Sequence, residues 1–365
     1  MSKKRDEAVT TGGIRDKLLK NTTIKTTALL SDSVYFKSQG APIATSVPMI
    51  NVALSGSMKG GLRSGLLQLA GPSKHFKTGF GLLVVQAFLK QHPDGMILFY
   101  DSEFGSPLSY FDAYQIPHDS VVHTPVTSLE ELRTDVVNQL AGLDRKDKVL
   151  IFLDSLGMLA SMKETDDAAE GKNKADFTRA KTIKSLFRIV SPKLSMLDVP
   201  MIVINHTYKT MDLYPQDVIG GGTGSVLAAN DIWVLGRRQE KEDDEIAGYS
   251  FVISIYKSRF IREKSKIAIK ITHEHGIHRW SGFWEEATDA GIIVAGEKKG
   301  QYNFIDPDTG EVHSGPFKQS DVEDEDSFWL SVLKRSNLEQ IVKDKYTLGS
   351  AGVITGEELV EESDA

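Results

Sequence analysis

A glycine–lysine–threonine loop that could bind phosphate is the strongest chemical feature of the sequence. Its residues are Gly71, Pro72, Ser73, Lys74, His75, Phe76, Lys77 and Thr78. The loop follows an apolar run at 66–70 and precedes another at 79–89, so its context is strand, loop and helix. Such a turn directs backbone amides and a helix N-terminus at phosphates, with Lys77 reaching the β- and γ-phosphates and Thr78 binding Mg²⁺. The sequence therefore predicts a nucleoside triphosphate site; a chance turn is the alternative.

Residue 76 departs from the general form of this loop, which has glycine where the chain has Phe76. A phenylalanine is strained at positive φ, whereas a glycine is not. Either the loop does not need that backbone conformation at Phe76, or it is distorted there.

Three acidic residues follow two other apolar runs. Asp154 comes after the run 149–153, and Asp101 and Glu103 come after the run 96–100. A carboxylate at the end of a buried parallel strand beside a phosphate loop can orient the water shell of Mg²⁺, which suits Asp154. Glu103 projects further past its strand and is the better candidate to polarise an attacking water. Each acid alone could be a solvated helix cap, but three at one sheet edge favour catalysis.

A fourth apolar run, 201–204, ends in Asn205 and His206. A polar side chain here could sense a γ-phosphate and signal to the connection that follows, 207–230. That connection is much longer than the usual length of about 2–6 residues, so it is functional or disordered. Its glycine-rich stretch would let backbone amides approach a polyanion: Gly220, Gly221, Gly222, Thr223 and Gly224. The alternatives are an ordinary strand-end histidine and a flexible linker.

Basic residues gather at two further places. The connection 156–176 leads into a helix with a broad basic face: Arg179, Lys181, Lys184 and Arg188. The stretch 256–266 includes Lys257 and Arg259. A single basic run is usually a solvated face. Beside two long polar connections in a phosphate-binding domain, these stretches predict a path for nucleic acid.

The elements that must position these residues are an alternating series of strands and helices. Strands are expected at 66–70, 96–100, 149–153, 201–204, 232–235, 250–256 and 267–271. Helices are expected at 77–91, 128–143 and 176–193. Continuous apolar runs separated by helices indicate an α/β fold with a mostly parallel sheet. The closely spaced last runs indicate antiparallel strands at one edge.

The chain divides by composition into four parts. Residues 1–50 are polar and are interpreted as an arm, 51–275 form the core, 276–350 form a small α/β appendix, and 351–365 form an acidic tail. At about 150 residues per domain, a chain of 365 residues holds two domains or one large core with appendages.

Composition excludes several classes of protein. Lys and Arg number 43 and Asp and Glu number 50, which gives a net charge of −7 and argues against a polybasic coat. The absence of cysteine excludes a disulfide scaffold, a cysteine-ligated metal centre and a cysteine nucleophile. No apolar run reaches about 18 residues, so a membrane span is not expected. The charged N-terminus lacks an apolar stretch after it, so a secretory signal is not expected either.

Together these motifs resemble those of RecA-type recombinases, and most closely the UvsX branch of T-even-like tailed phages. The resemblance covers about residues 30–290 and is carried by the segments 61–74, 76–78, 98–105, 149–157, 179–190, 204–208 and 220–224. Phe76 departs from the general loop but resembles the phage branch. The resemblance implies a RecA-like P-loop ATPase core that takes ATP and Mg²⁺.

The resemblance also implies roles at the nucleotide. The family's nucleotide and Mg²⁺ residues are matched by Lys77, Thr78 and Asp154. Glu103 matches the glutamate that activates water, and Tyr110 is similar to a tyrosine that stacks on adenine. His206 stands where RecA itself has glutamine, and a sensor role is expected for it.

Further roles concern DNA and the neighbouring subunit. The connections 156–176 and 207–230 match the two DNA-binding loops, so Arg179, Lys181 and the glycine-rich stretch are expected to bind DNA. Lys257 and Arg259 resemble the basic pair that reaches the ATP of the next subunit. An aromatic pair in the arm, Tyr35 and Phe36, resembles the patch that docks onto the next protomer; a local core pair is the alternative.

The expected function is that of an ATP-dependent recombinase. The resemblance implies helical filaments on single-stranded DNA, homologous pairing with duplex DNA, and strand exchange in phage recombination, repair and recombination-dependent replication. Mediator and single-strand-binding proteins would be partners, and the cytoplasm of the infected bacterial host would be the location. One alternative is a ring-shaped hexameric DNA helicase on the same fold. A second alternative is a nucleotide-gated scaffold without DNA-stimulated ATPase activity.

Overall fold

The structure is a computed structural model that describes residues 11–37, 40–172, 178–211, 217–242 and 245–349. The chain divides into two compact units, Met1–Ala41 and Pro42–Ala365. The acidic tail predicted at 351–365 lies outside the described residues. No helix within the described ranges is both long and apolar enough to cross a membrane.

The first unit contains short helical elements. They are α1 (Thr11–Asn21), the 3-10 helix η1 (Leu30–Asp32) and α2 (Val34–Lys37). Phe36 on α2 is largely exposed. The predicted arm ended at residue 50, but the structure ends this unit at Ala41. The next apolar segment contains α3 (Pro48–Ser55), which is buried in the core of the second unit and therefore belongs to it.

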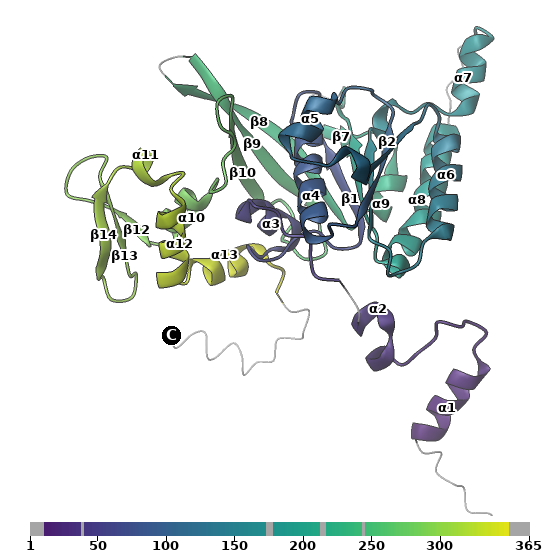
Figure 1. Cartoon of the computed structure of the whole chain (residues 1–365), viewed down its shortest axis with the longest axis horizontal. Helices are drawn as coiled ribbons and strands as arrows, with labels where there is room; N and C mark the ends of the chain where they lie inside the picture. The colour runs from purple at the N-terminus through teal and green to yellow at the C-terminus, as the bar shows by residue number, and fades with distance from the viewer. Residues whose placement is uncertain (1–10, 38–39, 173–177, 212–216, 243–244, 350–365) are drawn as a thin grey trace, which may run out of the picture. The chain divides into compact units, whose positions relative to one another are not determined.

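A nine-stranded sheet forms the centre of the second unit, in the order β11-β10-β9-β8-β1-β5-β4-β2-β3 (Figure 1). Its strands are β1 (Gly65–Ala70), β2 (Met96–Asp101), β3 (Val121–Pro125), β4 (Val149–Asp154), β5 (Pro200–Asn205), β8 (Asp231–Glu242), β9 (Glu245–Lys257), β10 (Lys266–Thr272) and β11 (Gly276–Ile277). The six strands from β8 to β3 are parallel, and β9, β10 and β11 are antiparallel additions at one edge. The predicted mostly parallel α/β fold is confirmed.

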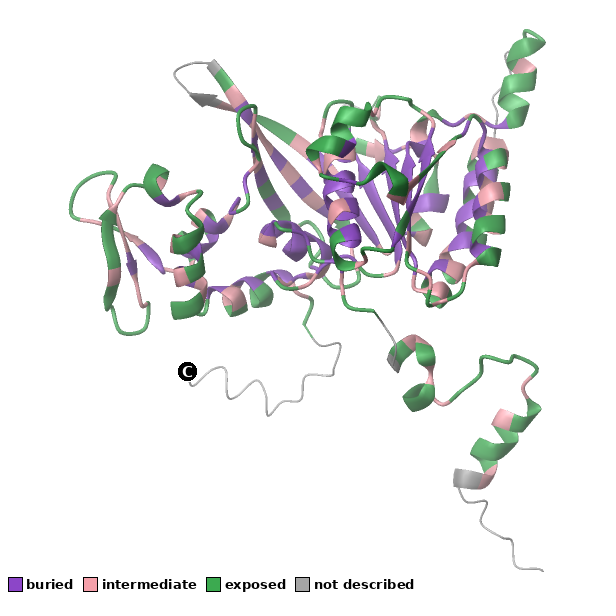
Figure 2. Cartoon of the chain, viewed as in Figure 1, coloured by how far each residue is buried: buried purple, intermediate pink, exposed green. Residues whose placement is uncertain are grey.

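Helices cover both faces of the inner parallel strands β1, β2, β4 and β5, so these strands are buried on both sides (Figure 2). On one face α3 and α4 (Lys77–Gln91) belong to the same apolar cluster as Leu67 and Leu69 of β1. On the other face α6 (Leu129–Gly142) and α8 (Thr178–Leu197) belong to the same apolar cluster as Leu66 and Ala70. Alternate residues of one strand point to opposite faces, which explains the continuous apolar runs in the sequence.

Strand β3 is the parallel strand that the sequence did not predict. Its residues are half-buried or exposed, because it forms the open edge of the sheet. It therefore lacks the continuous apolar run that identified the inner strands. The short helix α5 (Leu108–Ala113) and the 3-10 helix η2 (His118–Ser120) connect β2 to β3.

The two long connections contain elements of their own. The first includes η3 (Leu156–Met158) and α7 (Met162–Ala169), and the second includes the antiparallel pair β6 (Thr207–Lys209) and β7 (Asp217–Ile219). A further helix, α9 (Thr223–Ala228), follows directly after the glycines of the second connection. In the described residues, these segments form helices and a short strand pair, and α7 has no buried residue.

After β11 the chain forms a small region of mixed structure, as predicted. It contains α10 (Phe283–Asp289), a three-stranded sheet of β12 (Ile293–Ala295), β13 (Tyr302–Ile305) and β14 (Val312–Phe317), and the helices α11 (Gln319–Val322), α12 (Asp326–Arg335) and α13 (Leu338–Tyr346). The chain then returns to the core, where Thr347 forms a β-bridge with Ile261 and Glu339 forms an ion pair with Lys59 at 2.7 Å. Strands β8 and β9 form a long hairpin that projects from the sheet (Figure 1).

Candidate functional site

The phosphate loop connects β1 to α4, as the sequence predicted. Within it, Lys77 Nζ donates to the carbonyl oxygen of Pro72 at 2.8 Å, and the lysine is only 6% exposed. Burial lowers the pKa of Lys77, and the negative charges of Glu103 and Asp154 oppose that shift. The cation is therefore held inside the loop, beside two carboxylates.

Phe76 adopts the left-handed conformation that the general loop reserves for glycine. It lies at φ 57° and ψ 23° as the residue that precedes α4. Its ring lies 5.4 Å from the ring of Phe80 and 5.4 Å from that of Phe251. A Cβ atom on Gly79 would lie 2.4 Å from the same ring. The loop therefore does need this conformation, and aromatic packing over a glycine offsets the strain.

The candidate metal ligands are joined by a hydrogen bond. Thr78 Oγ1 donates to Asp154 Oδ2 at 2.7 Å. Burial raises the pKa of Asp154 to about 6, and the negative charges of Glu103 and Asp101 add to the shift. Mg²⁺ is usually held by one or two protein oxygens together with substrate phosphates, and this hydroxyl–carboxylate pair fits that requirement. No cluster of three or more His, Asp or Glu side chains able to hold a metal occurs among the described residues.

Glu103 lies at the centre of a hydrogen-bonded group. Its Oε1 atom lies 2.7 Å from His206 Nε2 and accepts a hydrogen bond of 2.5 Å from Ser155 Oγ. The contact with His206 lowers the pKa of Glu103, and Ser155 and Lys77 act in the same direction while burial opposes them. The carboxylate is therefore ionised at neutral pH and able to accept a proton.

Sequence reasoning missed Ser155. Its hydroxyl bonds to Glu103, and its backbone amide and carbonyl both bond to the hydroxyl of Ser102, at 3.0 and 2.7 Å. These contacts join the ends of β2 and β4. The signal was a hydroxyl residue directly after the strand-end Asp154, and it could have been included in the predicted site.

The end of β5 connects the phosphate loop to the glycine-rich stretch. The carbonyl of Asn205 accepts from the amide of Gly71 at 3.3 Å, and its side-chain amide donates to the carbonyl of Gly220 at 2.9 Å. Gly220 also donates from its backbone amide to the carbonyl of His206 at 2.9 Å. A Cβ atom on Gly157 would lie 2.6 Å from the His206 ring, so glycine leaves the space in which His206 reaches Glu103.

The glycine-rich stretch packs closely against α8. A Cβ atom on Gly221 would lie 2.8 Å from Ile183, and one on Gly224 would lie 2.7 Å from the Cα atom of Lys184. Gly221 also has a positive φ of 85°. The interpretation as a flexible linker is therefore wrong for these residues, because two of the glycines serve close packing.

Arg179 is half-buried and its side chain is held by backbone carbonyls. Its guanidinium donates to the carbonyls of Leu156, Gly157 and Leu159 at 3.1, 3.0 and 2.9 Å. These bonds fix the start of the first long connection, and the DNA contact of Arg179 stays a prediction. Lys181 is exposed on the same helix, and its DNA contact remains a prediction.

Lys257 and Arg259 lie apart from the other candidate residues. Lys257 pairs with Ile232 at the start of β8, and Ile232 is in register with Gln68 inside β1, before the loop begins. Lys257 Nζ donates to the carbonyls of Val226 and Leu227 in α9, at 2.9 and 3.0 Å. Burial lowers the pKa of Lys257, and Arg259 acts in the same direction.

A buried aspartate lies beside this basic pair. Asp231 Oδ1 accepts from the hydroxyl of Ser258 at 2.6 Å. Burial raises the pKa of Asp231 to about 6, although Ser258, Arg259 and Lys257 oppose the shift. The local charge here is therefore mainly positive, unlike that around Asp154.

Two further residues, Tyr110 and Arg237, lie outside the hydrogen-bonded group. Tyr110 lies on α5 and is 49% exposed, so its predicted adenine contact stays a prediction. Arg237, which the sequence did not indicate, donates to the carbonyl of Lys74 at 3.2 Å and lies 4.6 Å over the ring of Tyr249. The prediction ended this strand at 235, whereas β8 continues through charged residues to Glu242.

The sheet order and the polar groups at the carboxyl ends of its parallel strands place the chain in the class of α/β proteins with a RecA-like core. A search of curated proteins finds a relative in Enterobacteria phage T4 that is described as a recombination and repair protein. The two chains are 43% identical over 352 residues, which covers 95% of this chain and 88% of the T4 protein. The chain therefore belongs to the family of phage recombination and repair proteins. A scan against protein-family models finds no match.

Proposed function

We propose that the protein is an ATP-dependent recombinase of the RecA type, from the UvsX branch. It forms helical filaments on single-stranded DNA and pairs that strand with a homologous duplex. It acts in phage recombination, repair and recombination-dependent replication, in the cytoplasm of the infected bacterial host. The description of the T4 relative as a recombination and repair protein supports the biological role.

One observation carries the biochemical proposal. Hydrogen bonds join Thr78 to Asp154 and Glu103 to His206, and backbone contacts of His206 continue to Gly220. A phosphate loop, an ionised carboxylate and a glycine-rich stretch are thereby connected over a few residues. This arrangement suits a protein in which hydrolysis of a triphosphate changes the hold on another ligand.

The hydrolytic step follows from the charges of the side chains. The loop amides and Lys77 bind the phosphates of ATP, and Thr78 and Asp154 hold Mg²⁺. When bound, Mg²⁺ supplies neutralisation of the phosphate charge. Glu103 accepts a proton from the water that attacks the γ-phosphate, because its carboxylate is ionised and lies at the carboxyl end of the sheet.

The basic pair completes the site from a second copy of the chain. Lys257 and Arg259 are displaced from their own loop by the strand register, so they reach the nucleotide of a neighbour instead. Their positive charge suits a γ-phosphate, as trans-acting cations do in other phosphoryl-transfer enzymes. ATP and DNA affinities are then reciprocally coupled through the filament.

DNA lies along the two long connections in this proposal. Lys181 and the backbone amides of the glycine-rich stretch contact the phosphates of the single strand, and the homologous duplex approaches the same surface. Mediator and single-strand-binding proteins assist loading. Because Lys181 of each successive subunit contacts phosphates, DNA binding weakens as the salt concentration rises.

One set of measurements tests the proposal. ATP hydrolysis is measured with and without single-stranded DNA, and the complex with a slowly hydrolysed ATP analogue is imaged by electron microscopy. The proposal predicts DNA-stimulated hydrolysis, extended helical filaments and joint molecules with homologous duplex. Closed six-fold rings would instead indicate a helicase, and hydrolysis that DNA does not stimulate would indicate a nucleotide-gated scaffold.

A further inference from the structure

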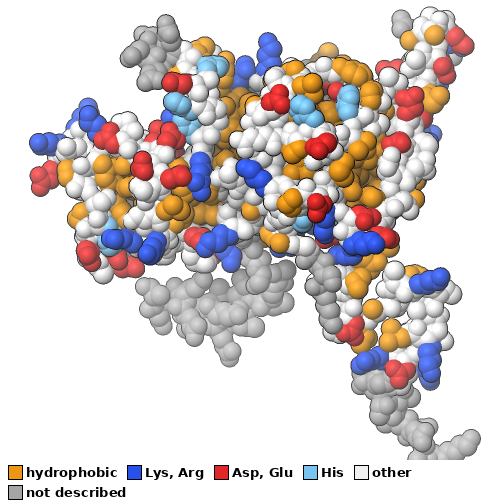
Figure 3. Space-filling view, viewed as in Figure 1, with side chains coloured by type: hydrophobic (Ala, Val, Ile, Leu, Met, Phe, Trp, Pro, Cys, Tyr) orange, Lys and Arg blue, Asp and Glu red, His pale blue; other side chains and the backbone are white. Residues whose placement is uncertain are grey.

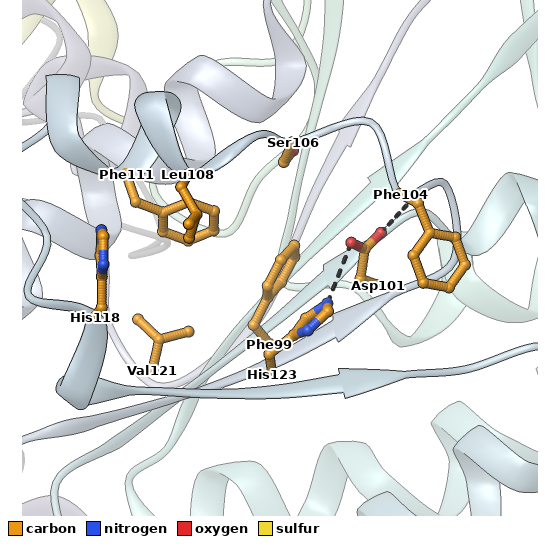
Figure 4. Close-up of a pocket in the computed structure, with 9 residues that line it drawn as sticks. All are labelled: Phe99, Asp101, Phe104, Ser106, Leu108, Phe111, His118, Val121 and His123. Carbon is orange, nitrogen blue, oxygen red and sulfur yellow. Dashed lines mark hydrogen bonds and ion pairs between the residues drawn. The ribbon is translucent and has the colours of Figure 1, made fainter.

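A cavity of about 320 Å³ lies between α5 and the edge strand β3 (Figure 4). Apolar side chains line most of it, and Asp101, Ser106, His118 and His123 supply its polar groups. Hydrophobic and histidine side chains lie together on the surface over this region (Figure 3). The cavity contains an Asp–His pair that the proposed reaction does not use directly.

Asp101 holds the turn from which Glu103 projects. It is the last residue of β2, and its side chain is 7% exposed. Its Oδ1 atom accepts from the backbone amides of Glu103 and Phe104, at 3.1 and 2.8 Å. Phe104 has a positive φ of 53°, a conformation that a phenylalanine adopts only when its surroundings hold it. One carboxylate oxygen therefore fixes both the strained turn and the backbone of Glu103.

The second carboxylate oxygen contacts His123. Asp101 Oδ2 lies 3.3 Å from His123 Nε2, and Figure 4 shows the two side chains pointing toward each other from neighbouring strands. The His123 ring also lies 5.5 Å from the ring of Phe99, with which it is in register on β2. His123 is thus held in place by its strand and by an aromatic contact, and it faces a buried carboxylate.

We propose that Asp101 and His123 are positioning residues for Glu103. Asp101 fixes the backbone turn, and His123 holds the Asp101 carboxylate in the orientation that accepts both amides. Glu103 then stays within reach of Ser155 and His206. The inference rests on the proposed function, because the position of Glu103 affects turnover only if the protein hydrolyses ATP. A displacement of about 1 Å in a reacting group can lower a rate about 10²-fold.

A pair of substitutions separates the acceptor atom from its charge. Asp101→Asn removes the negative charge but keeps an oxygen that can accept the two amides, whereas Asp101→Ala removes both. We expect Asp101→Ala to lower kcat about 10²-fold while the Kd of a fluorescent nucleotide changes less than about twofold. We expect Asp101→Asn to retain most of the turnover. Equal losses in the two variants would overturn the proposal.

A double-mutant cycle tests whether Asp101 acts through Glu103. If it does, Asp101→Ala adds no further loss to the Glu103→Gln variant. His123→Ala is expected to lower kcat several-fold, and His123→Gln, which keeps an amide donor, to recover part of that loss. If the kcat of the double variant falls by the product of the two single losses, Asp101 and Glu103 act independently and the proposal is overturned.

Amide hydrogen exchange gives a measurement that does not depend on hydrolysis. In the nucleotide-free protein, Asp101→Ala should accelerate exchange at Glu103 and Phe104 at least about tenfold, and Asp101→Asn should not. Asp112→Ala is the matched control, because Asp112 forms a similar pair with His118 at 2.9 Å on the same cavity but does not contact the Glu103 turn.

The outcomes distinguish this proposal from the proposed function. Full turnover by Asp101→Ala, in a protein that Glu103→Gln inactivates, would overturn the positioning role and leave the function intact. If Asp101→Ala lowers nucleotide affinity as much as it lowers kcat, Asp101 supports the fold in general, and the positioning role is overturned. If the wild-type protein hydrolyses no ATP, the proposed function fails, and unchanged exchange at the two amides would then reject the structural part of the inference as well.

Discussion

Two regions of the second unit each bury one aspartate whose pKa is raised to about 6, but their electrostatic surroundings are opposite. At the carboxyl edge of the sheet, Asp154 lies near the negative charges of Glu103 and Asp101. At the end of β9, Asp231 lies near the positive charges of Arg259 and Lys257. Burial is the main cause of the shift in both regions, so the neighbours, not the aspartates, distinguish them.

The difference shows that the two regions are complementary. The carboxyl edge has an excess of negative charge and suits a divalent cation with its phosphates, whereas the end of β9 has an excess of positive charge and suits an anion. The strand register separates them within one chain. Under the proposed function, a site that combines the two is formed by two copies of the chain.

The regions also differ in how their side chains are held. Thr78, Asp154, Glu103 and His206 bond to one another's side chains in pairs, so that half of the site is formed without a partner. Lys257 instead donates to carbonyls in the last turn of α9, where a cation is favoured by the helix dipole.

The largest effect is expected from Glu103→Gln. The amide keeps the size of the side chain but cannot accept a proton from water, so turnover should fall roughly 10³-fold. Nucleotide and DNA binding should remain, because Lys77 and the loop are unchanged. Steady-state hydrolysis and DNA binding measured at the same protein concentration check this. Loss of DNA binding together with turnover would contradict the role given to Glu103.

Lys257→Ala tests the other half of the site. Removing one transition-state cation should lower DNA-stimulated turnover roughly 10²-fold or more, with little change in nucleotide affinity. The sharper measurement mixes this variant with Glu103→Gln subunits. Each variant alone is inactive, but some interfaces in the mixture join an intact Glu103 to an intact Lys257 from the neighbour, and we expect turnover to return there. A mixture as inactive as its components would show that Lys257 acts within its own chain.

The sequence was sufficient to predict the carboxyl-edge region. Parallel strands end at the same edge, so apolar runs followed by Asp154, Glu103 and His206 had to place these side chains near the loop. The contacts of Glu103 with His206 and of Thr78 with Asp154 follow from that topology. The resemblance to a known family supplied the pairing of Lys257 and Arg259 with a neighbour, which strand patterns do not reveal.

Other features depended on contacts that a sequence does not contain. The conformation of Phe76 is set by the rings of Phe80 and Phe251, and Phe251 comes from a strand far along the chain. The contact between Asp101 and His123 requires β3, which has no apolar run to identify it. The carbonyl contacts of Arg179 could not be predicted because their partners lie in a connection with no recognisable pattern.

The pH dependence of stability should be similar in the two regions without ligands. Each aspartate has a folded pKa near 6 and an ordinary value of 3.8, so the folded state holds the proton more tightly. Stability therefore falls as pH rises from about 4 to about 6, by up to about 3 kcal/mol for each group. Asp154→Asn and Asp231→Asn should each remove the contribution of that aspartate to the pH dependence. The free energy of unfolding is measured with denaturant, in the presence of a chelator, at the two ends of that pH range.

Ligands should then separate the two regions. Mg²⁺ with ADP should offset the stability lost when Asp154 ionises and should leave the loss caused by Asp231 unchanged. Only the first region has an excess of negative charge that binds a divalent cation. Unfolding curves with and without Mg·ADP at neutral pH check the difference. An equal response of both asparagine variants to the ligand would contradict the comparison.

The smallest effect concerns the packing that holds the loop. Gly79→Ala places a methyl group against the Phe76 ring, which should cost about 1–3 kcal/mol of stability and weaken ATP binding. Replacing Phe76 by glycine as well should recover part of that cost, because the clash and the left-handed strain both disappear. Gly142→Ala on α6 is the control, since nothing lies within 4 Å of its added Cβ atom. Gly79→Ala subunits keep Lys257 and should still supply it to a neighbour. Mixing them with Lys257→Ala subunits should therefore restore turnover at the sites of the Lys257→Ala subunits. If turnover does not return, the two regions are not independent.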